Sequence, residues 1–253
     1  MTTRFTTGNL KSVLKFPFQD AKWKSKFAIL ALLSIGSILI IPGFFIGGYI
    51  YESMRRIIVD KAEVPTLPDW DDMGTCFKNG LRMFGVGLVY SLPTWITLLL
   101  SFAILVPLMI LGSGSNRYEE SLMVVGPILT GLMVLGYAAG FITQFLSITA
   151  LSHMIARNEF YAAFRIREWW PILRNNLGGY VLTYLLVFGA SYAMGFAIQI
   201  LIFTIVLCIT VPFLWLAFYS YILVICGVLF AQAYNEGVER NAAQPTPAAQ
   251  PAS

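Results

Sequence analysis

Four long runs of apolar residues dominate the chain. They cover Leu81–Leu111, Leu122–Leu151, Leu177–Cys208 and Val211–Ala233. Each run exceeds the roughly 20 residues that a helix needs to cross about 30 Å of hydrocarbon, and Arg82 is the only charged residue inside any of them. We therefore predict four membrane-spanning helices, with kinks expected at Pro93 and Pro107 in the first.

A fifth apolar run, Phe27–Tyr51, is interrupted by Pro42 and Gly43. It fits either one kinked spanning helix or a short hairpin made of Phe27–Ile41 and Phe44–Ile58. A helix of 15 residues rises only about 22 Å, so a hairpin here is either re-entrant or steeply slanted. Both interpretations remain open on length alone.

The distribution of basic residues favours the hairpin. With it, all of the 17 Lys and Arg residues except Arg117 lie on one side of the membrane. A single span instead moves the N-terminal basic residues to the other side. Because cytoplasmic loops are enriched in Lys and Arg, we predict a multi-pass protein of the cytoplasmic (inner) membrane with both termini in the cytoplasm. The turns at Gly112–Ser121 and Cys208–Val211 then face outside.

The hairpin also reveals three irregular repeats, at about residues 10–59, 67–157 and 160–238. Each begins with a stretch rich in Trp and basic residues, which we expect to form an amphipathic helix at the membrane interface. These stretches are Lys15–Phe27, Leu67–Phe84 and Arg167–Tyr180. We predict one all-α polytopic domain over residues 1–238, with six hydrophobic helices, and a disordered Ala/Pro/Gln-rich tail over residues 239–253.

Aromatic residues mark the predicted interfacial helices. Those expected at headgroup level are Trp23, Trp70, Trp169 and Trp170. In the second stretch an apolar face is predicted from Trp70, Met73, Phe77 and Leu81, with Asp69 as the N-cap. In the third stretch the predicted apolar stripe is Ile166, Trp169, Trp170 and Leu173.

Composition excludes several classes of protein. Hydrophobic residues make up 57% of the 253 residues and charged residues 12%, and the mean hydropathy is +0.72. A soluble domain has about 25% charged residues, so a soluble enzyme, a disordered chain and a secreted disulfide scaffold are excluded. A net charge of +4 is too small to indicate nucleic acid as a partner. Three cysteines and no Cys-x-x-Cys pair argue against a disulfide framework or a cysteine metal site, and no cofactor is expected.

Two segments carry a resemblance to a known family. They are GYIYESMRR, followed by LPDWDDMGTCFKNGLRMFGVGLVYSLP. The pattern resembles the uncharacterised integral-membrane family catalogued as domain of unknown function 4013. The residues that match it are Gly48, Tyr49, Arg55, Arg56, Leu67, Pro68, Trp70, Asp71, Asp72, Gly80, Tyr90 and Pro93. The resemblance implies architecture and membrane location, and no catalytic residue.

Few residues suggest chemistry. Glu52, close to an apolar run, pairs naturally with Arg55 and Arg56 but is also the first candidate for a ligand contact. Gln144, Gln199 and Gln232 lie inside apolar helices, where they either join helices or line a path for a substrate. We expect Gln144 and Gln232 to face the protein interior, because an unpartnered amide in hydrocarbon is costly.

Other polar groups have ordinary explanations. Asp69, Asp71 and Asp72 could bind a divalent cation, but helix capping explains them. His153, the only histidine, has no obvious partner in sequence, which favours a structural role over general acid–base chemistry.

The sequence therefore supports two functional hypotheses. The first is a non-enzymatic membrane protein that acts as a scaffold, assembly factor or lipid organiser, with the bilayer, anionic lipid headgroups and a membrane protein or second copy as partners. The second is a transporter or channel component for an uncharged or lipid-like substrate. No phosphate-binding loop, Gly-x-Ser-x-Gly or His-Glu-x-x-His motif supports an enzyme.

Overall fold

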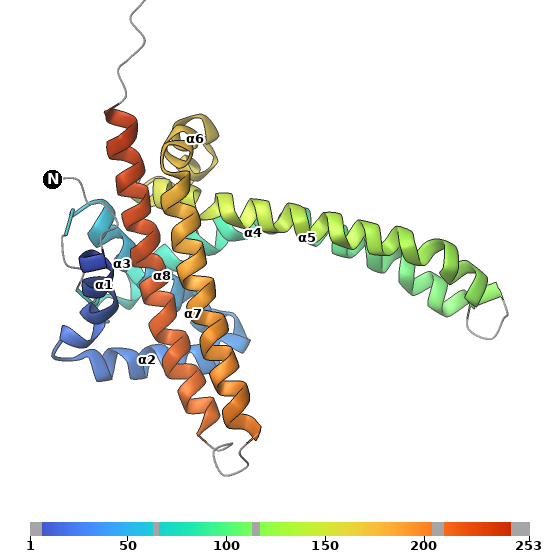
Figure 1. The fold of residues 1–253 in the computed structure, drawn as a ribbon, viewed down its shortest axis with the longest axis horizontal. Helices are drawn as coiled ribbons and strands as arrows, with labels where there is room; N and C mark the ends of the chain where they lie inside the picture. The colour runs from blue at the N-terminus through green and yellow to red at the C-terminus, as the bar shows by residue number, and fades with distance from the viewer. Residues whose placement is uncertain (1–6, 63–65, 113–116, 204–209, 244–253) are drawn as a thin grey trace, which may run out of the picture. The chain divides into compact units, whose positions relative to one another are not determined.

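The computed structural model describes residues 7–62, 66–112, 117–203 and 210–243, and every regular element in these ranges is a helix (Figure 1). In chain order the elements are α1 (Thr7–Gln19), α2 (Trp23–Gly36), η1 (Ser37–Leu39), α3 (Ile41–Ile58), α4 (Met73–Gly112), α5 (Arg117–Arg157), η2 (Phe160–Phe164), α6 (Ile166–Asn175), α7 (Leu177–Phe203) and α8 (Val211–Ala242). The predicted all-α architecture is confirmed.

Four of these helices, α4, α5, α7 and α8, are long and apolar enough to cross a membrane. They contain the four predicted apolar runs as far as the structure describes them, so the chain is a multi-pass membrane protein. In α4 and α7 only 6% of the most apolar 18-residue window is buried within the protein. Such surfaces need lipid or another apolar partner around them.

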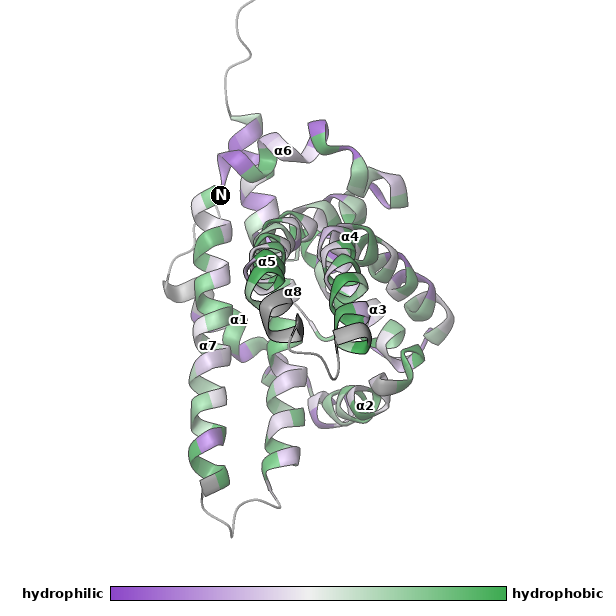
Figure 2. Cartoon of the chain, turned by 90° about the vertical axis from the view of Figure 1, so that its right-hand side faces the viewer, coloured by the Kyte–Doolittle hydropathy of each residue, from purple (hydrophilic) through white to green (hydrophobic). Residues whose placement is uncertain are grey.

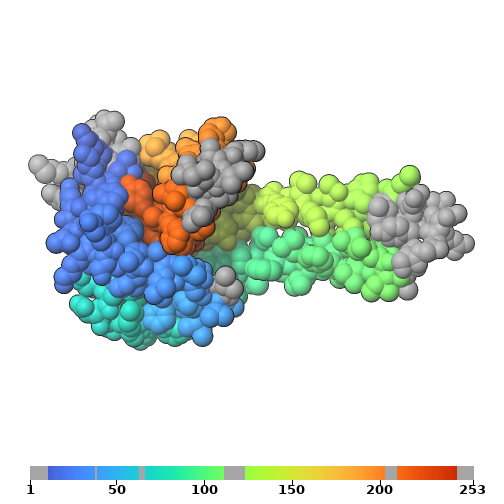
Figure 3. Space-filling model, turned by 90° about the horizontal axis from the view of Figure 1, so that it is seen from below, coloured from blue at the N-terminus to red at the C-terminus, as the bar shows by residue number. Residues whose placement is uncertain are grey.

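The chain packs as two compact units. The first comprises residues 1–84 and 149–253, and the second comprises residues 85–148. In the first unit α8 contacts α1, α2, α3, α6 and α7. Figure 1 shows α8 with α7 on one side and α1–α3 on the other, and Figure 3 shows the surface of α8 next to that of the N-terminal helices.

Helix α8 is the centre of this unit because small residues let its neighbours approach. A Cβ atom at Gly227 would lie 3.0 Å from Cγ2 of Ile50, and one at Gly237 would lie 2.6 Å from the carbonyl oxygen of Ile172. The stretch from Val224 to Gly237 is accordingly almost continuously buried. Figure 2 shows hydrophilic residues gathered around α6 and the adjoining end of α8.

The ambiguous fifth run forms two short helices, and neither is among the four candidate spans. The break falls at Ile40, just before the expected Pro42–Gly43 turn. Ile40 has φ 65°, a left-handed conformation that is unusual for a β-branched residue. Pro42 lies in the first turn of α3, where its missing N–H costs no hydrogen bond.

The second unit contains residues 85–112 of α4 and 117–148 of α5. Here two glycines of α5 meet threonine side chains of α4. A Cβ atom at Gly136 would overlap the side chain of Thr97, and one at Gly140 would overlap Thr94. The Thr97 hydroxyl donates to the carbonyls of Pro93 (3.0 Å) and Thr94 (2.9 Å) on its own helix, so this hydroxyl is paired without a partner from α5.

The structure corrects several local predictions. No separate helix precedes α4, because residues 66–72 are irregular and the helix that begins at Met73 continues into the span. In α6 the buried residues are Trp169, Ile172 and Leu173, whereas Ile166 and Trp170 are 55% and 47% exposed. The predicted stripe is therefore confirmed at Trp169 and Leu173 and wrong at Ile166 and Trp170.

Predictions at the turns and at the C-terminal tail are only partly covered by the structure. Helix α8 continues to Ala242, beyond the predicted start of the tail at residue 239. The rest of the tail, residues 244–253, lies outside the described residues, as do residues 113–116 and 208–209 of the two turns expected to face outside.

Candidate functional site

A charged cleft of about 420 Å³ lies in the first unit, where α3 ends and α4 begins. Three segments supply its walls. Helix α3 supplies Gly48, Tyr49, Glu52, Arg55 and Arg56, the irregular segment supplies Pro68, Asp69, Asp71 and Asp72, and α4 supplies Thr75, Cys76 and Asn79. The cleft therefore sits at the polar end of a membrane-spanning helix.

Two glycines bring α3 and α4 close enough to form this cleft. A Cβ atom at Gly48 would overlap the carbonyl of Cys76, and one at Gly80 would overlap the carbonyl of Phe44. The Cys76 thiol donates a hydrogen bond to the carbonyl of Phe45 at 3.2 Å. Because backbone meets backbone, the crossing requires residues without a side chain at both positions.

An aromatic pair lies behind the cleft. The rings of Tyr49 and Trp70 stack with centroids 4.5 Å apart and an interplanar angle of 19°. Tyr49 is 1% exposed. Neither its hydroxyl nor the Trp70 Nε1 has a hydrogen-bond partner among the described residues, although buried donors are normally satisfied.

The two arginines of the cleft differ in the number of hydrogen bonds and ion pairs that they make. Arg56 Nη1 donates to Oγ1 of Thr66 at 2.6 Å and to the carbonyl of Thr66 at 3.3 Å, which fixes the irregular segment to α3. Arg55 makes one long ion pair with Glu52, at 3.6 Å, and its side chain is 44% exposed. The guanidinium of Arg55 thus keeps most of its donors open to the cleft.

A buried lysine, Lys26, binds the irregular segment that forms one wall of the cleft. Nζ of Lys26 lies 2.7 Å from the Asp20 carboxylate, 2.9 Å from the Asp69 carboxylate and 2.9 Å from the carbonyl of Leu67. Burial alone would lower the pKa of Lys26, but the hydrogen bonds to Asp20 and Asp69 outweigh it and raise that pKa. The same hydrogen bond from Lys26 lowers the pKa of Asp20.

This arrangement corrects the predicted N-cap. Asp72, not Asp69, caps α4: its Oδ1 accepts the backbone N–H of Thr75 at 2.9 Å. Hydrogen bonding by the Thr75 side chain and backbone lowers the pKa of Asp72. Asp69 is instead bound to Lys26, a residue far away in sequence.

The residues that carry the family resemblance meet at this cleft. Seven of them line it: Gly48, Tyr49, Arg55, Arg56, Pro68, Asp71 and Asp72. The model of a family described as protein of unknown function (DUF4013) matches residues 35–207. The chain belongs to this family. No curated protein and no solved structure matches the chain.

For this DUF4013 protein, the predicted candidate residues fall in different places. Glu52 lies in the cleft, with 32% of its side chain exposed. Gln199 lies elsewhere, in an apolar pocket, and Gln232 is half-buried on α8. Gln144 is exposed on α5, so the expectation that it faces the protein interior is wrong.

The four predicted interfacial tryptophans also differ in their surroundings. Trp23 is half-buried near Phe18 and Phe27, Trp70 stacks on Tyr49, and Trp170 is exposed. Trp169 is 0% exposed and donates Nε1–H to the carbonyl of Ala163 at 3.0 Å. Its role is to pack α6 within the first unit.

A second polar cluster was missed by sequence reasoning, which gave His153 no partner. Nδ1 of His153 lies 2.8 Å from the Tyr234 hydroxyl, and Nε2 lies 3.1 Å from Oε2 of Glu168. The hydrogen bond from His153 lowers the pKa of Glu168. The cluster joins α5, α6 and α8, with His153 2% exposed and the Glu168 side chain 38% exposed.

Among the described residues, no group of three or more His, Cys, Asp or Glu side chains is arranged to hold a metal ion. Asp69, Asp71 and Asp72 do not form such a group: Asp69 binds Lys26 and Asp72 caps α4. The cleft is lined by both carboxylates and guanidinium groups.

Proposed function

We propose that this protein is a non-enzymatic integral membrane protein that binds and organises phospholipid. The observation that carries the proposal is the charged cleft at the beginning of the spanning helix α4, built from residues that the family pattern contains. Phospholipids present a charged headgroup at this level of the bilayer. An enzyme would further need a nucleophile or a general base arranged for reaction, and we assign none.

The position of the protein in the membrane is part of the proposal. Both termini, the segment before α4 and helix α6 lie on the cytoplasmic side of the inner membrane, as the bias of basic residues indicates. The three repeats of the sequence correspond to α1–α3, to the segment from 67 to the end of α5, and to α6–α8. In this arrangement the cleft opens toward the cytoplasmic headgroups.

Anionic lipid is a further partner in this proposal. Lys11, Lys15, Lys22 and Lys24 are exposed on and after α1, and each basic residue near an anionic surface contributes about 1 kcal/mol. Lys26 does not take part, because it is buried against Asp20 and Asp69. Exchange of the four exposed lysines for Gln in the full chain should reduce salt-sensitive binding to vesicles containing anionic lipid.

Lipid retention tests the central claim. The full chain is purified in mild detergent, and bound lipids and proteins are identified by native mass spectrometry. We expect phospholipid that survives delipidating washes and is lost from Arg55→Gln, with Gln144→Leu as the matched control outside the cleft. A folded protein that retains no phospholipid would contradict the proposal.

A topology experiment tests the proposed orientation. Single cysteines at Thr3, Asn116 and Asn241, in a background without Cys76, Cys208 and Cys226, are treated with an impermeant thiol reagent on intact cells. Only the cysteine at position 116 should react. Labelling at position 3 with protection at position 241 would exclude the first hairpin.

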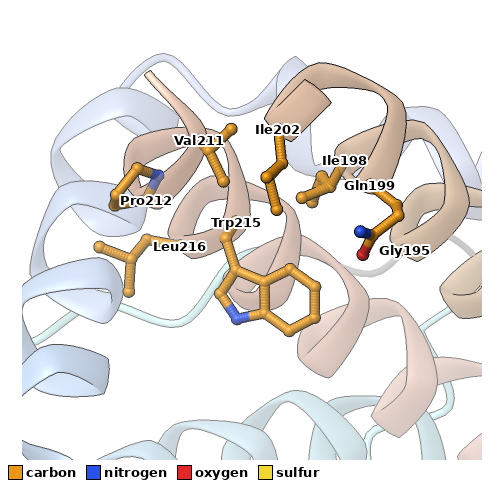
Figure 4. Close-up of a pocket in the computed structure, with 8 residues that line it drawn as sticks. All are labelled: Gly195, Ile198, Gln199, Ile202, Val211, Pro212, Trp215 and Leu216. Carbon is orange, nitrogen blue, oxygen red and sulfur yellow. The ribbon is translucent and has the colours of Figure 1, made fainter. Parts of the chain in front are cut away.

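Transport of an uncharged or lipid-like substrate is the second candidate function. One observation favours it: a pocket of about 630 Å³ is formed by residues of α7 and α8, with the Gln199 amide among apolar side chains (Figure 4). Under this alternative, Gln199→Leu would abolish binding of the retained lipid or small molecule. Under our proposal it leaves lipid retention unchanged.

A further inference from the structure

The charges of the cleft are unequal, and this imbalance limits what it can bind. Four carboxylates, those of Glu52, Asp69, Asp71 and Asp72, face two guanidinium groups. Lys26 is shared between Asp69 and Asp20, and Glu52 lies 3.6 Å and 3.9 Å from the two arginines. The cleft therefore carries an excess of negative charge, and Asp71 and Asp72 make no ion pair among the described residues.

The positive end of the cleft is Arg55. Arg56 is engaged by Thr66 and Leu67 of the irregular segment, whereas within the described part of the chain Arg55 makes its ion pair with Glu52 alone. A guanidinium with free N–H groups is suited to phosphate oxygens. The cleft therefore offers an anion site at Arg55 and a cation site at Asp71 and Asp72.

Two buried polar atoms point to an occupant rather than to a purely structural cluster. The Tyr49 hydroxyl, on a residue that lines the cleft and is 1% exposed, has no hydrogen-bond partner among the described residues. The neighbouring Trp70 Nε1 also lacks one. An unsatisfied buried donor costs free energy, which a polar ligand or a water molecule carried with it would recover.

Apolar residues of α4 follow the cleft toward the membrane. Leu81 and Phe84 are 48% and 47% exposed, one to two turns beyond Cys76 and Asn79 of the cleft wall and on another face of the helix. A ligand that fits both surfaces has a charged head and a hydrocarbon part. This combination describes a membrane lipid better than a soluble metabolite.

The aromatic pair argues against a methylated ammonium group. Recognition of a quaternary ammonium relies on open aromatic faces around the cation. Tyr49 and Trp70 instead cover one another's faces by stacking at 19°. A primary ammonium, with three N–H donors for carboxylate acceptors, matches Asp71 and Asp72.

We propose that the cleft binds the headgroup of an ethanolamine-type phospholipid, with its ammonium at Asp71 and Asp72 and its phosphate at Arg55. The acyl chains extend into the bilayer beside the membrane-spanning helix α4. This inference rests on the proposed function and assigns it a lipid class and a set of contacts.

Thermal stabilisation of the full chain in detergent tests the assignment. The probes are dioctanoyl phosphatidylethanolamine, phosphatidylcholine and phosphatidylglycerol, together with free phosphoethanolamine and, after EDTA treatment, MgCl₂. We expect the ethanolamine lipid to raise the melting temperature more than any other probe, because binding to the native state stabilises it.

Substitutions test which side chains bind the lipid headgroup. Asp71→Asn combined with Asp72→Asn should weaken binding of the ethanolamine lipid about tenfold, the effect of losing a hydrogen bond to a charged group. Asn at position 72 keeps an N-cap for α4. Arg55→Gln should weaken it similarly, while Asp60→Asn and Lys78→Gln, at exposed positions outside the cleft, should leave it unchanged.

Each contrary outcome has a distinct meaning. Equal stabilisation by the three lipids would overturn the headgroup assignment while leaving lipid organisation intact. Stabilisation by free phosphoethanolamine equal to that by the lipid would overturn the lipid as its source, and stabilisation by MgCl₂ that Asp71→Asn abolishes would replace the headgroup with a cation. Absence of retained phospholipid altogether would contradict the proposed function itself.

Discussion

The α3–α4 crossing of the first unit and the α4–α5 packing of the second both depend on glycine, but the glycines meet different atoms. Gly48 and Gly80 face backbone carbonyls of the opposite helix, whereas Gly136 and Gly140 face the side chains of Thr97 and Thr94. A backbone carbonyl cannot move without moving its helix, while a threonine can change its rotamer. The first contact is therefore rigid and the second adaptable.

The rigid contact lies beside the charged cleft, and the adaptable contact lies in a unit whose surface is apolar. The crossing at Gly48 fixes the cleft, where charged groups must keep their mutual distances. The second unit presents apolar residues such as Leu99, Phe102 and Ile110, which are 65%, 56% and 69% exposed. Hydrocarbon around such residues does not depend on their exact positions.

Alanine at Gly48 should have the largest effect, because its Cβ atom would overlap the Cys76 carbonyl. Overpacking of this kind costs about 3 kcal/mol, which we expect as a fall in thermal stability and as loss of lipid binding in the cleft. Gly43→Ala, in the same helix with no atom within 4 Å of the added Cβ, is the matched control and should be neutral or stabilising. Similar stability of the two variants would show that the crossing relaxes.

Removal of the Lys26 charge should have the next largest effect. Lys26→Met leaves the carbonyl of Leu67 and the carboxylate of Asp20, whose side chain is 19% exposed, without their partner. Breaking fully buried ion pairs costs about 3–5 kcal/mol. Because Asp20 and Asp69 reach solvent, we expect a smaller loss of about 2 kcal/mol. Lys24→Met, at an exposed neighbour, should change thermal stability little.

Alanine at Gly136 should cost only about 1 kcal/mol, since Thr97 can rotate away. The cost should disappear in the double variant with Thr97→Ala, which removes the overlapping side chain. Measurement of all four forms in a double-mutant cycle separates this contact from general effects on α5. A cost that persists in the double variant would mean that the helices themselves had moved apart.

Lowering the pH should destabilise the first unit and leave the second unchanged, and this is the smallest effect that we expect. The Asp20 pKa is lowered in the folded protein, so its contribution to stability is complete above the ordinary aspartate pKa of about 3.8 and is lost as the pH falls below it. We expect faster hydrogen exchange in α2 below this pH and no change in residues 85–112. In Asp20→Asn the acid-dependent part of the change should vanish.

The sequence predicted those features that depend on residues close together in the chain. Runs of apolar residues predicted all four long helices, since length and hydropathy decide membrane insertion. The family resemblance selected the residues around Arg55 and Asp71, and the structure shows that these residues line one cleft. The burial of Lys26 could not be predicted, because two of its three partners, Asp69 and the carbonyl of Leu67, are distant in sequence and reach it only once α2 has packed.

Two errors have physical reasons. In α6 two apolar stripes are possible in a helix of ten residues, and only packing against α8 selects Trp169, Ile172 and Leu173. For His153, the partners Glu168 and Tyr234 come from other helices. A cue was available, because a polar ring in an apolar helix needs a partner somewhere in the fold.

The central position of α8 has a consequence for biosynthesis. This helix follows α1–α7 in the chain, yet it packs on α1, α2, α3, α6 and α7. At ribosomal rates of about 5–20 residues per second, α3 waits roughly 10–30 s after its own synthesis before α8 emerges. During that interval the surface that later receives Gly227 and its neighbours is uncovered. Until α8 is inserted, lipid or another protein has to cover this surface.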